Sequence, residues 1–365
     1  MKESLANFLK PVNPKTVELP GFSSSDMFKN VVEFFDGSDH FFSEKKYDVI
    51  LIGVPGDTVT AIRKWLYSLR KDFNTLSIAD AGNLLGKSDN DRYYALQYVA
   101  ERLISKETVV LFIGGCESLN RAVLDFAKKV NSSLSLAVVD SIVDNWLAKS
   151  IDNCGNYIED VVLAGAQRYF LAPGYEKLFI DNFYRIIYLG DLRAEIDGAE
   201  PGIRDADSFF FSFKSVKGEP HKVVGISSPH GIEPYDACKM MRFAGFSDKV
   251  KIAALSDIDC KNGYSDKRTL LAAQMVWFFI DGVAGRCCDH PTNNDKRYVK
   301  KYITPHGMDE GITFYDNSVT GRWWIEVPAK NGSNIKSCRE VDYNNALEGD
   351  IPDTWWRFFR KNRSG

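Results

Sequence analysis

Residues Val109-Val110-Leu111-Phe112-Ile113-Gly114-Gly115-Cys116-Glu117-Ser118 decide the fold class of this chain. The segment opens with five consecutive apolar residues, as in a strand that is buried on both faces of a parallel sheet. Two glycines end the strand, and apolar residues from Leu119 to Ala127 then recur at the spacing of a helix with one apolar face. The segment therefore predicts a buried strand that turns directly into a core-facing helix.

The same order of strand and helix repeats over more than two hundred residues, which is typical of a parallel sheet covered by helices on both faces. We expect further helices over 96–104, Pro234–Ala244 and Lys267–Gly282. The fold class predicted is a three-layer α/β/α domain with a mainly parallel sheet. Its expected strands are Tyr47–Gly53, Val109–Gly114, Leu134–Asp140, Val161–Gly165, Arg185–Gly190, Ser208–Phe213 and Ile252–Asp257.

The pattern changes after about residue 295, where two short strands are expected at Ile312–Tyr315 and Arg322–Val327. Four of the seven tryptophans lie in this last part of the chain, and such large side chains need a packing surface. We therefore expect a small Trp-rich β/α appendage that packs on the main domain, with a surface for a protein partner as the alternative. The domains expected are an N-terminal extension 1–44, an α/β domain 45–294 and an appendage 295–365.

The composition excludes several classes of partner. The chain has 365 residues with 46 Lys and Arg against 49 Asp and Glu, without a basic stripe, so neither nucleic acid nor an anionic membrane is expected. No apolar stretch approaches the roughly 20 residues that cross a bilayer, and no secretory signal pattern is present. Seven cysteines without C-x-x-C spacing indicate reduced thiols, as expected in the cytoplasm.

Polar side chains cluster at the carboxyl ends of four expected strands, which is where open α/β sheets form their sites. These ends comprise residues 114–118, 140–144, 212–217 and 256–259. Together, in this order and spacing, they resemble the signature of the ureohydrolases, the family of arginase, agmatinase and formimidoylglutamase. The resemblance covers about residues 45 to 290 and is greatest to the formimidoylglutamase-like branch with a Trp-rich tail. It implies an arginase-like fold and self-association into oligomers.

In that family the motifs G-G-D-H-S, D-x-H-x-D and S-x-D-x-D hold two manganese ions, and the resemblance shows where this chain departs from them. The first motif has lost its aspartate and histidine, the second its histidine, and the third both aspartates to a lysine and a valine. The aspartates of the second motif remain, and another aspartate stands at the position of the family's substrate-binding glutamate. In chain order, the residues at these positions are Cys116, Glu117, Asp140, Ile142, Asp144, Lys214, Val216 and Asp257.

Histidine ligands are missing from the region in which the resemblance would require them. The five histidines leave none between residues 41 and 220, so no small shift of register restores an imidazole ligand. We therefore assign no catalytic residue, metal or cofactor, and we interpret the chain as a catalytically degenerate protein with a structural, regulatory or ligand-sensing role. In this hypothesis Lys214 supplies the positive charge that offsets the remaining carboxylates.

Two enzymatic alternatives stay open. In the first, Glu117, Asp140 and Asp144 bind a single manganese ion, and the protein hydrolyses linear amidines. An ammonium at Lys214 argues against this, because it repels a nearby divalent ion. In the second, the thiol of Cys116 is a nucleophile at a helix N-terminus. The acidic neighbour Glu117 and the lack of a nearby histidine base in the sequence argue against that chemistry.

Overall fold

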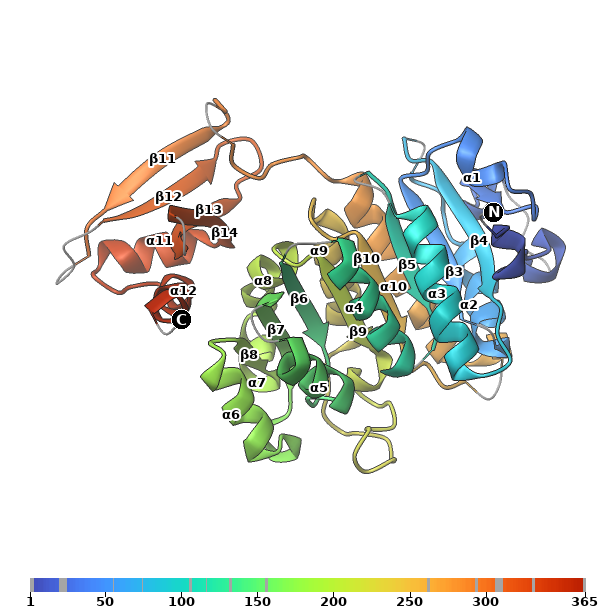
Figure 1. Cartoon of the computed structure of the whole chain (residues 1–365), viewed down its shortest axis with the longest axis horizontal. Helices are drawn as coiled ribbons and strands as arrows, with labels where there is room; N and C mark the ends of the chain where they lie inside the picture. The colour runs from blue at the N-terminus through green and yellow to red at the C-terminus, as the bar shows by residue number, and fades with distance from the viewer. Residues whose placement is uncertain are drawn as a thin grey trace.

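The computed structural model describes residues 3–363 apart from 20–24, 55, 74, 105–106, 116, 131–132, 155–156, 261–262, 293–294, 306–310 and 330–331. Its main body is built on one large sheet, in which the strands run parallel except for β1 (Figure 1). The strands of this sheet are β1 (Leu9–Lys10), β2 (Val32–Phe34), β3 (Val49–Gly53), β4 (Ile78–Leu84), β5 (Val109–Ile113), β6 (Leu134–Val139), β7 (Ile158–Ala166), β8 (Arg185–Tyr188), β9 (Ser208–Ser212) and β10 (Ile252–Ser256).

Helices cover both faces of the sheet. Alternate residues of β3 show why, because Val49 and Leu51 belong to one hydrophobic core while Ile50 and Ile52 belong to the other. The first core packs against α2, α9 and α10, and the second packs against α3, α4 and α5. The predicted three-layer α/β/α class is therefore confirmed. The helices are α1 (Phe41–Glu44), α2 (Asp57–Ser68), α3 (Asp89–Leu103), α4 (Glu117–Val130), α5 (Asn145–Cys154), α6 (Pro173–Asp181), α7 (Leu189–Ala194), α8 (Glu200–Arg204), α9 (Pro234–Phe246) and α10 (Lys267–Ala284).

The strand order places the candidate site. Neighbouring strands follow the order β1-β4-β3-β5-β10-β9-β6-β7-β8, and β2 also pairs with β4. Strands β5, β10, β9 and β6 are therefore adjacent, although they are far apart in the sequence. Parallel strands end at the same edge of the sheet, and ligand sites of open α/β sheets lie where the chain crosses from one half to the other. The four strand ends of the sequence motifs meet at that edge.

The N-terminal part of the chain adds strands to the far side of the sheet. β1 pairs antiparallel with β4, and β2 pairs parallel with the same strand. β4 was not predicted from the sequence, because Asp80 and Asn83 interrupt its apolar pattern. Asp80 is nevertheless fully buried, since Arg63 on α2 binds its carboxylate with both Nε (2.7 Å) and Nη2 (2.9 Å).

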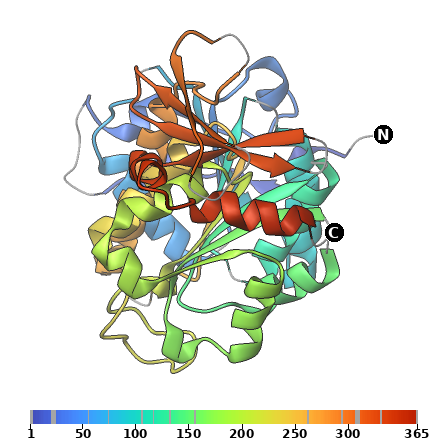
Figure 2. The ribbon, with the colours of Figure 1, turned by 90° about the vertical axis from the view of Figure 1, so that its left-hand side faces the viewer.

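The C-terminal appendage is an antiparallel four-stranded sheet with two helices. Figure 2 shows this sheet and the last helix lying across one end of the main body. Trp323 and Ile325 of β13 face the appendage's own core, which includes Trp355 and Phe358 of α12. The elements are β11 (Tyr298–Ile303), β12 (Ile312–Asn317), β13 (Trp323–Ala329), β14 (Gly332–Cys338), α11 (Glu340–Leu347) and α12 (Asp353–Arg363).

Charged contacts fasten the appendage to the amino ends of the main strands. Arg357 of α12 binds Asp160 at the start of β7 (2.9 Å), and Lys336 of β14 binds the neighbouring Glu159 (3.0 Å). Trp324, on the opposite face of β13 from Trp323, lies under the guanidinium of Arg204 at 4.5 Å. The appendage therefore packs on the end of the sheet opposite to the motif residues.

No helix in the described part of the chain is both long enough and apolar enough to cross a membrane.

Candidate functional site

Three carboxylates from two different strand ends converge on a single ammonium group. Nζ of Lys222 lies 2.7 Å from Oδ2 of Asp140 and 3.0 Å from Oδ2 of Asp257, and it also contacts Oδ2 of Asp144. Asp140 and Asp144 follow β6, whereas Asp257 follows β10. The side chain of Asp140 is 4% exposed and those of the other three are 10–12% exposed, so the ion cluster is largely withdrawn from water.

Lys222 reaches the cluster from a folded loop between β9 and α9, residues 217–232. The loop leaves the main body as the yellow segment at the bottom of Figure 1. Its two limbs are hydrogen-bonded like a small hairpin: Ser228 N donates to Glu219 O (2.9 Å), and His221 N donates to Ile226 O (2.9 Å). At its base, Lys217 N donates to Ile232 O (2.9 Å). This pairing fixes the position from which the lysine side chain extends.

The backbone at Asp257 is held in an unusual conformation. Its φ angle is 63°, which a residue with a side chain adopts only rarely. Asp257 N donates to Gly115 O (2.9 Å), and Ser212 Oγ donates to Oδ2 of the same aspartate (2.9 Å). The ends of β5, β9 and β10 thus cooperate to aim the Asp257 carboxylate at Lys222. Strained backbone of this kind is found often at functional sites.

The protonation states of the cluster follow from the contact of three carboxyl groups with one lysine. Burial lowers the pKa of Lys222, but Asp140, Asp257 and Asp144 together raise it above its ordinary value. Burial raises the pKa of Asp140 to about 7; Lys222 opposes this rise, while the charges of Asp144 and Asp257 add to it. The lysine is therefore charged at neutral pH, and Asp140 takes up a proton near neutral pH.

His221, next to the cluster in sequence, is a packed residue. It is 1% exposed, its ring lies 4.1 Å from that of Phe170, and its Nδ1 accepts a hydrogen bond from Val223 N (3.2 Å). Burial and the charge of Lys222 lower the pKa of His221, so the imidazole is neutral at physiological pH. Its Nε2 has no hydrogen-bond partner among the described residues.

The structure corrects the expected source of positive charge. From the sequence, Lys214 was expected to supply it, but Lys214 forms none of the ion pairs found among the described residues. Lys214 lies in the short turn Phe213–Ser215 at the end of β9, where its two neighbours are buried and its own side chain is half-buried. Lys222, eight residues further on, makes the contacts instead. No motif marks Lys222, because its position depends on how the whole loop folds.

The other expected site residues divide into three groups. Asp140, Asp144 and Asp257 are brought together as described above. Ile142 and Val216 lie at the same edge of the sheet without donor atoms, and Val216 is buried and bridged to Ile232. Cys116 lies outside the described residues. For Glu117, the structure describes the backbone at the start of α4 but not the side chain.

The described residues do not fit a dinuclear manganese site. No group of three or more His, Cys, Asp or Glu side chains in the described ranges is placed to hold a metal ion. The ammonium of Lys222 fills the space between the carboxylates, where it would oppose a divalent ion. Ile142 and Val216 offer no ligand atoms.

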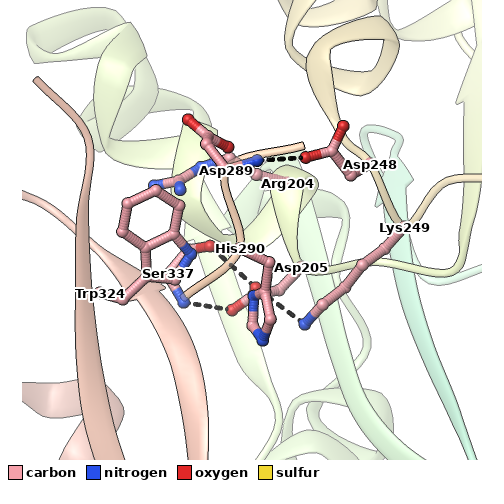
Figure 3. Close-up of a pocket in the computed structure, with 8 residues that line it drawn as sticks. All are labelled: Arg204, Asp205, Asp248, Lys249, Asp289, His290, Trp324 and Ser337. Carbon is pink, nitrogen blue, oxygen red and sulfur yellow. Dashed lines mark hydrogen bonds and ion pairs between the residues drawn. The ribbon is translucent and has the colours of Figure 1, made fainter. Parts of the chain in front are cut away.

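A hollow lies at the junction of the main body and the appendage (Figure 3). It measures about 220 Å³, including space open to solvent. Its charges are largely paired: Lys249 binds Asp205 (3.3 Å), and Arg322 binds Asp289 with two contacts of 3.0 and 3.1 Å. These pairs indicate a docking interface between the two parts of the chain. The lining residues are Arg204, Asp205, Asp248, Lys249, Asp289, His290, Trp324 and Ser337.

Comparisons with known proteins place the fold. Neither protein-family models nor curated proteins give a match to the sequence. Among solved structures, Trypanosoma cruzi formiminoglutamase with Mn²⁺ is similar over 66% of this chain and 95% of its own, with a TM-score of 0.56 and 17% identity. Proclavaminate amidino hydrolase from Streptomyces clavuligerus matches 74% of this chain and 100% of its own, with a TM-score of 0.57 and 17% identity.

Formimidoylglutamase from Bacillus subtilis is similar over 74% of this chain and 96% of its own, with a TM-score of 0.58 and 14% identity. Identities this low carry information about the fold alone. The sheet order, the two helical layers and these similarities together establish that the chain has an arginase-like α/β fold, extended by a four-stranded antiparallel appendage.

Proposed function

We propose that this chain is a catalytically inactive protein with a ureohydrolase fold, kept for a structural, regulatory or ligand-sensing role. The observation that carries the proposal is the contact of Lys222 with Asp140, Asp144 and Asp257. The structural neighbours are named as formiminoglutamases and an amidino hydrolase, and the first is described with Mn²⁺. In this chain, the ammonium of Lys222 lies between the three carboxylates at the carboxyl edge of the sheet.

The electrostatics support an inactive site. The ammonium of Lys222 alone would repel a divalent ion 4 Å away by on the order of 8 kcal/mol at an effective dielectric constant near 20, which cancels the attraction of one carboxylate at the same distance. Such an ion would bind only if the lysine moved out or lost its proton, and the three carboxylates oppose both. Without an ion that lowers the pKa of bound water, the cluster has no means of producing hydroxide at neutral pH.

The direct test is an assay for hydrolysis by the purified, reduced full-length protein with added manganese. Arginine, agmatine, guanidinobutyrate and formiminoglutamate are supplied in turn, and urea, ammonia and formamide are measured. We expect no turnover above the rate of a heat-denatured sample. Turnover at ordinary enzymatic rates of about 1 s⁻¹ or more with any of these compounds would contradict the proposal.

A matched pair of variants shows whether Lys222 is the group that excludes metal. Lys222→Ala removes the ammonium from the carboxylates, whereas Lys217→Ala removes an exposed lysine of the same loop that pairs with Glu233. In equilibrium dialysis we expect manganese to bind more tightly to Lys222→Ala than to the wild type, and Lys217→Ala to match the wild type. Equal affinity in all three proteins would show that Lys222 does not exclude the ion.

The alternative function is a hydrolase of linear amidines with an atypical single-metal site. It is favoured by one observation, that Asp140 and Asp144 approach the same cation from one strand end. In this alternative the wild-type protein binds one manganese ion and Asp144→Asn weakens the binding. Calorimetric titration of the wild type with manganese separates the two functions, because the inactive protein gives no heat of specific binding.

We also propose that the chain self-associates and that its parts follow the division 1–44, 45–294 and 295–365. The arginase-superfamily fold supports self-association by analogy alone. Sedimentation velocity at several protein concentrations tests it, and a monomer at all of them would exclude a stable oligomer.

A further inference from the structure

Two adjacent cysteines lie in the connection between the main body and the appendage. Cys287 and Cys288 follow the end of α10, which is capped at Gly285, and precede β11. Both residues are exposed, and both are free thiols. The connection is the extended orange segment that crosses from α10 toward β11 in Figure 1. This pair takes no part in the carboxylate cluster or in the proposed function.

The other described cysteines differ from this pair. Cys238 and Cys338 are each 3% exposed, and burial raises the pKa of the Cys238 thiol to about 12. Cys260 is half-buried, and burial, with Asp266 adding to the effect, raises its pKa to about 12 as well. These three thiols are also far apart in the sequence. Among the described cysteines, only residues 287 and 288 offer two accessible sulfurs side by side.

Charged groups of both signs lie around the pair: the cations Arg286 and Lys251, and the carboxylate of Asp248, which acts on the same two cations. A negative charge at Cys288 counteracts the fall in pKa that burial produces at Arg286 and at Lys251, so both cations lie within electrostatic reach of the Cys288 sulfur. Arg286 is itself held in place, because its Nε donates to Gly245 O (2.8 Å) and its Nη2 donates to Val250 O (3.0 Å). Thiols that reagents can reach from solvent are the ones that react with electrophiles and soft metals, and both of these cysteines are exposed.

The backbone of the pair is anchored while its side chains stay open to solvent. The guanidinium of Arg297 donates to Cys287 O (3.2 Å) and to Cys288 O (2.9 Å). Cys288 has a φ angle of 47°, in the left-handed region. The same guanidinium binds Asp295, so the anchor is fixed on the appendage side of the connection.

Chain geometry decides which reaction suits the two sulfurs. Cα atoms of adjacent residues are about 3.8 Å apart. Disulfides usually join residues whose Cα atoms are about 4.4–6.8 Å apart. A direct S–S bond between Cys287 and Cys288 would therefore be strained and easily reduced. A single larger atom that bonds to both sulfurs avoids that strain. We propose that Cys287 and Cys288 form a dithiol site for soft trivalent metalloids, with trivalent arsenic as the representative ligand.

The reaction with an organic arsenoxide is a condensation without a redox change. Two S–H bonds and the As–O bonds of the arsenoxide break, two As–S bonds form, and both protons leave with the oxygen as one water molecule. The arsenic stays trivalent, and no oxidant or reductant is needed. The product is a ring that contains the arsenic, the two sulfurs and the backbone between the two Cβ atoms, and it ties the two side chains together at the connection between the main body and the appendage.

The position of the site gives its occupation a structural consequence. Asp289, the next residue, is 2% exposed and binds Arg322 of the appendage, while its backbone N donates to Asp248 of the main body (3.0 Å). A ring at residues 287 and 288 therefore restrains the chain beside a residue that contacts both parts. We expect protection from proteases within 285–297 when the site is occupied.

The test uses phenylarsine oxide and the reduced full-length protein, followed by intact-protein mass spectrometry. We expect one phenylarsenic group per chain, stable to excess glutathione and removed by 2,3-dimercaptopropanol, because only a dithiol competes with a two-sulfur adduct. Cys287→Ser and Cys288→Ser, each alone, should lose the glutathione-resistant adduct. Cys260→Ser and the double variant Cys116→Ser/Cys154→Ser serve as controls and should retain it.

Each outcome decides the proposal. A wild-type protein without a glutathione-resistant adduct would overturn it, as would retention of the adduct in either Cys287→Ser or Cys288→Ser. Loss of the adduct in Cys116→Ser/Cys154→Ser with retention in Cys287→Ser would move the site to another pair and equally overturn it. Far-ultraviolet circular dichroism of every variant checks that the fold is unchanged.

Discussion

Lys222 links the loop 217–232 to three carboxylates through a side chain that is only 12% exposed. A buried ion pair gains Coulomb energy but loses hydration, so its net contribution to stability can be small. Removing only one partner is nevertheless costly, because the other charge stays buried without a partner. Taking the ammonium away leaves three acids facing one another without a counter-charge. The residue is therefore expected to matter far more to stability than a surface lysine does.

The first prediction concerns that charge. Lys222→Met should lower the free energy of unfolding by about 3–5 kcal/mol at pH 8, because it leaves buried carboxylates unpaired. The loss should shrink at pH 5, where the acids can take up protons. Urea denaturation at both pH values measures it. Lys217→Met is the control, and its exposed pair with Glu233 should cost no more than about 1 kcal/mol. A loss as small for Lys222→Met would contradict the burial argument.

The second prediction concerns Asp140, whose pKa burial raises from 3.8 to about 7 in the folded protein. The folded state thus binds this proton more tightly than the unfolded state does, so its contribution to stability is full below pH 4 and is lost as pH rises to about 7. Asp140→Asn cannot titrate. The stability of this variant, measured by urea denaturation at steps from pH 4 to 8, should fall less steeply than that of the wild type. Parallel curves would show that Asp140 does not carry the proton.

At the scale of the structural elements, the loop 217–232 depends on close backbone packing at its base. A Cβ atom added at Gly231 would lie 2.5 Å from Lys217 N and 2.8 Å from Ser215 O, and both of these are backbone atoms. The loop would have to shift to make room. Since Lys222 extends from this loop, a shift at its base moves the ammonium relative to the carboxylates.

The third prediction follows from this packing. Gly231→Ala should destabilise the protein by about 1–3 kcal/mol, the usual cost of overpacking. It should also increase hydrogen exchange across residues 217–232. Gly174→Ala, in α6 where the added atom meets nothing within 4 Å, should be neutral or slightly stabilising. Thermal unfolding and exchange mass spectrometry measure both variants, and unchanged exchange in Gly231→Ala would show that the loop does not depend on this contact.

Much of the element pattern could be predicted from the sequence, and the exceptions have physical reasons. β5 and β10 consist of buried residues on both faces, so their continuous apolar runs identify them. β4 was not predicted because it contains a buried charged residue, Asp80, whose burial is made possible by its ion pair with Arg63. β14 was not predicted from the sequence because its first three residues are exposed and not apolar.

The candidate site was predicted to the same partial extent. Asp140 and Asp257 directly follow β6 and β10, and Asp144 lies in the short connection between β6 and α5, so the sheet brings the three close together. Lys222 does not stand at a strand end. Its position depends on the pairing of Pro220 with Ser227, in a loop whose sequence has no periodic pattern. A charge that reaches a site from a loop leaves no spacing signal in the sequence.

At the scale of the whole molecule, ion pairs between partly or fully buried groups hold the appendage to the main body. Arg357 binds Asp160 and also donates to Phe183 O (3.1 Å), and both charged side chains are less than 15% exposed. Burial alone would raise the pKa of Asp160, but Arg357 outweighs this effect and lowers it. The pair therefore stays ionised through the neutral range of pH.

The fourth prediction tests this attachment. Arg357→Met should cost about 3 kcal/mol, because Asp160 loses its main counter-charge in a buried setting. Limited proteolysis should then cut more rapidly within the connection 285–297. Arg360→Met, three residues further along α12 and exposed, is the matched control and should be cut like the wild type. Equal cleavage of Arg357→Met and the wild type would show that other contacts hold the appendage.

The docking of α12 at the start of β7 has a practical consequence for measurements on this protein. Because parallel strands begin and finish at opposite edges, the chain's last helix and the Lys222 loop face opposite ways. A sensor surface or bead coupled through a C-terminal tag would therefore leave that loop turned toward the solution. Screening of small molecules against the carboxylate cluster is best carried out in that orientation.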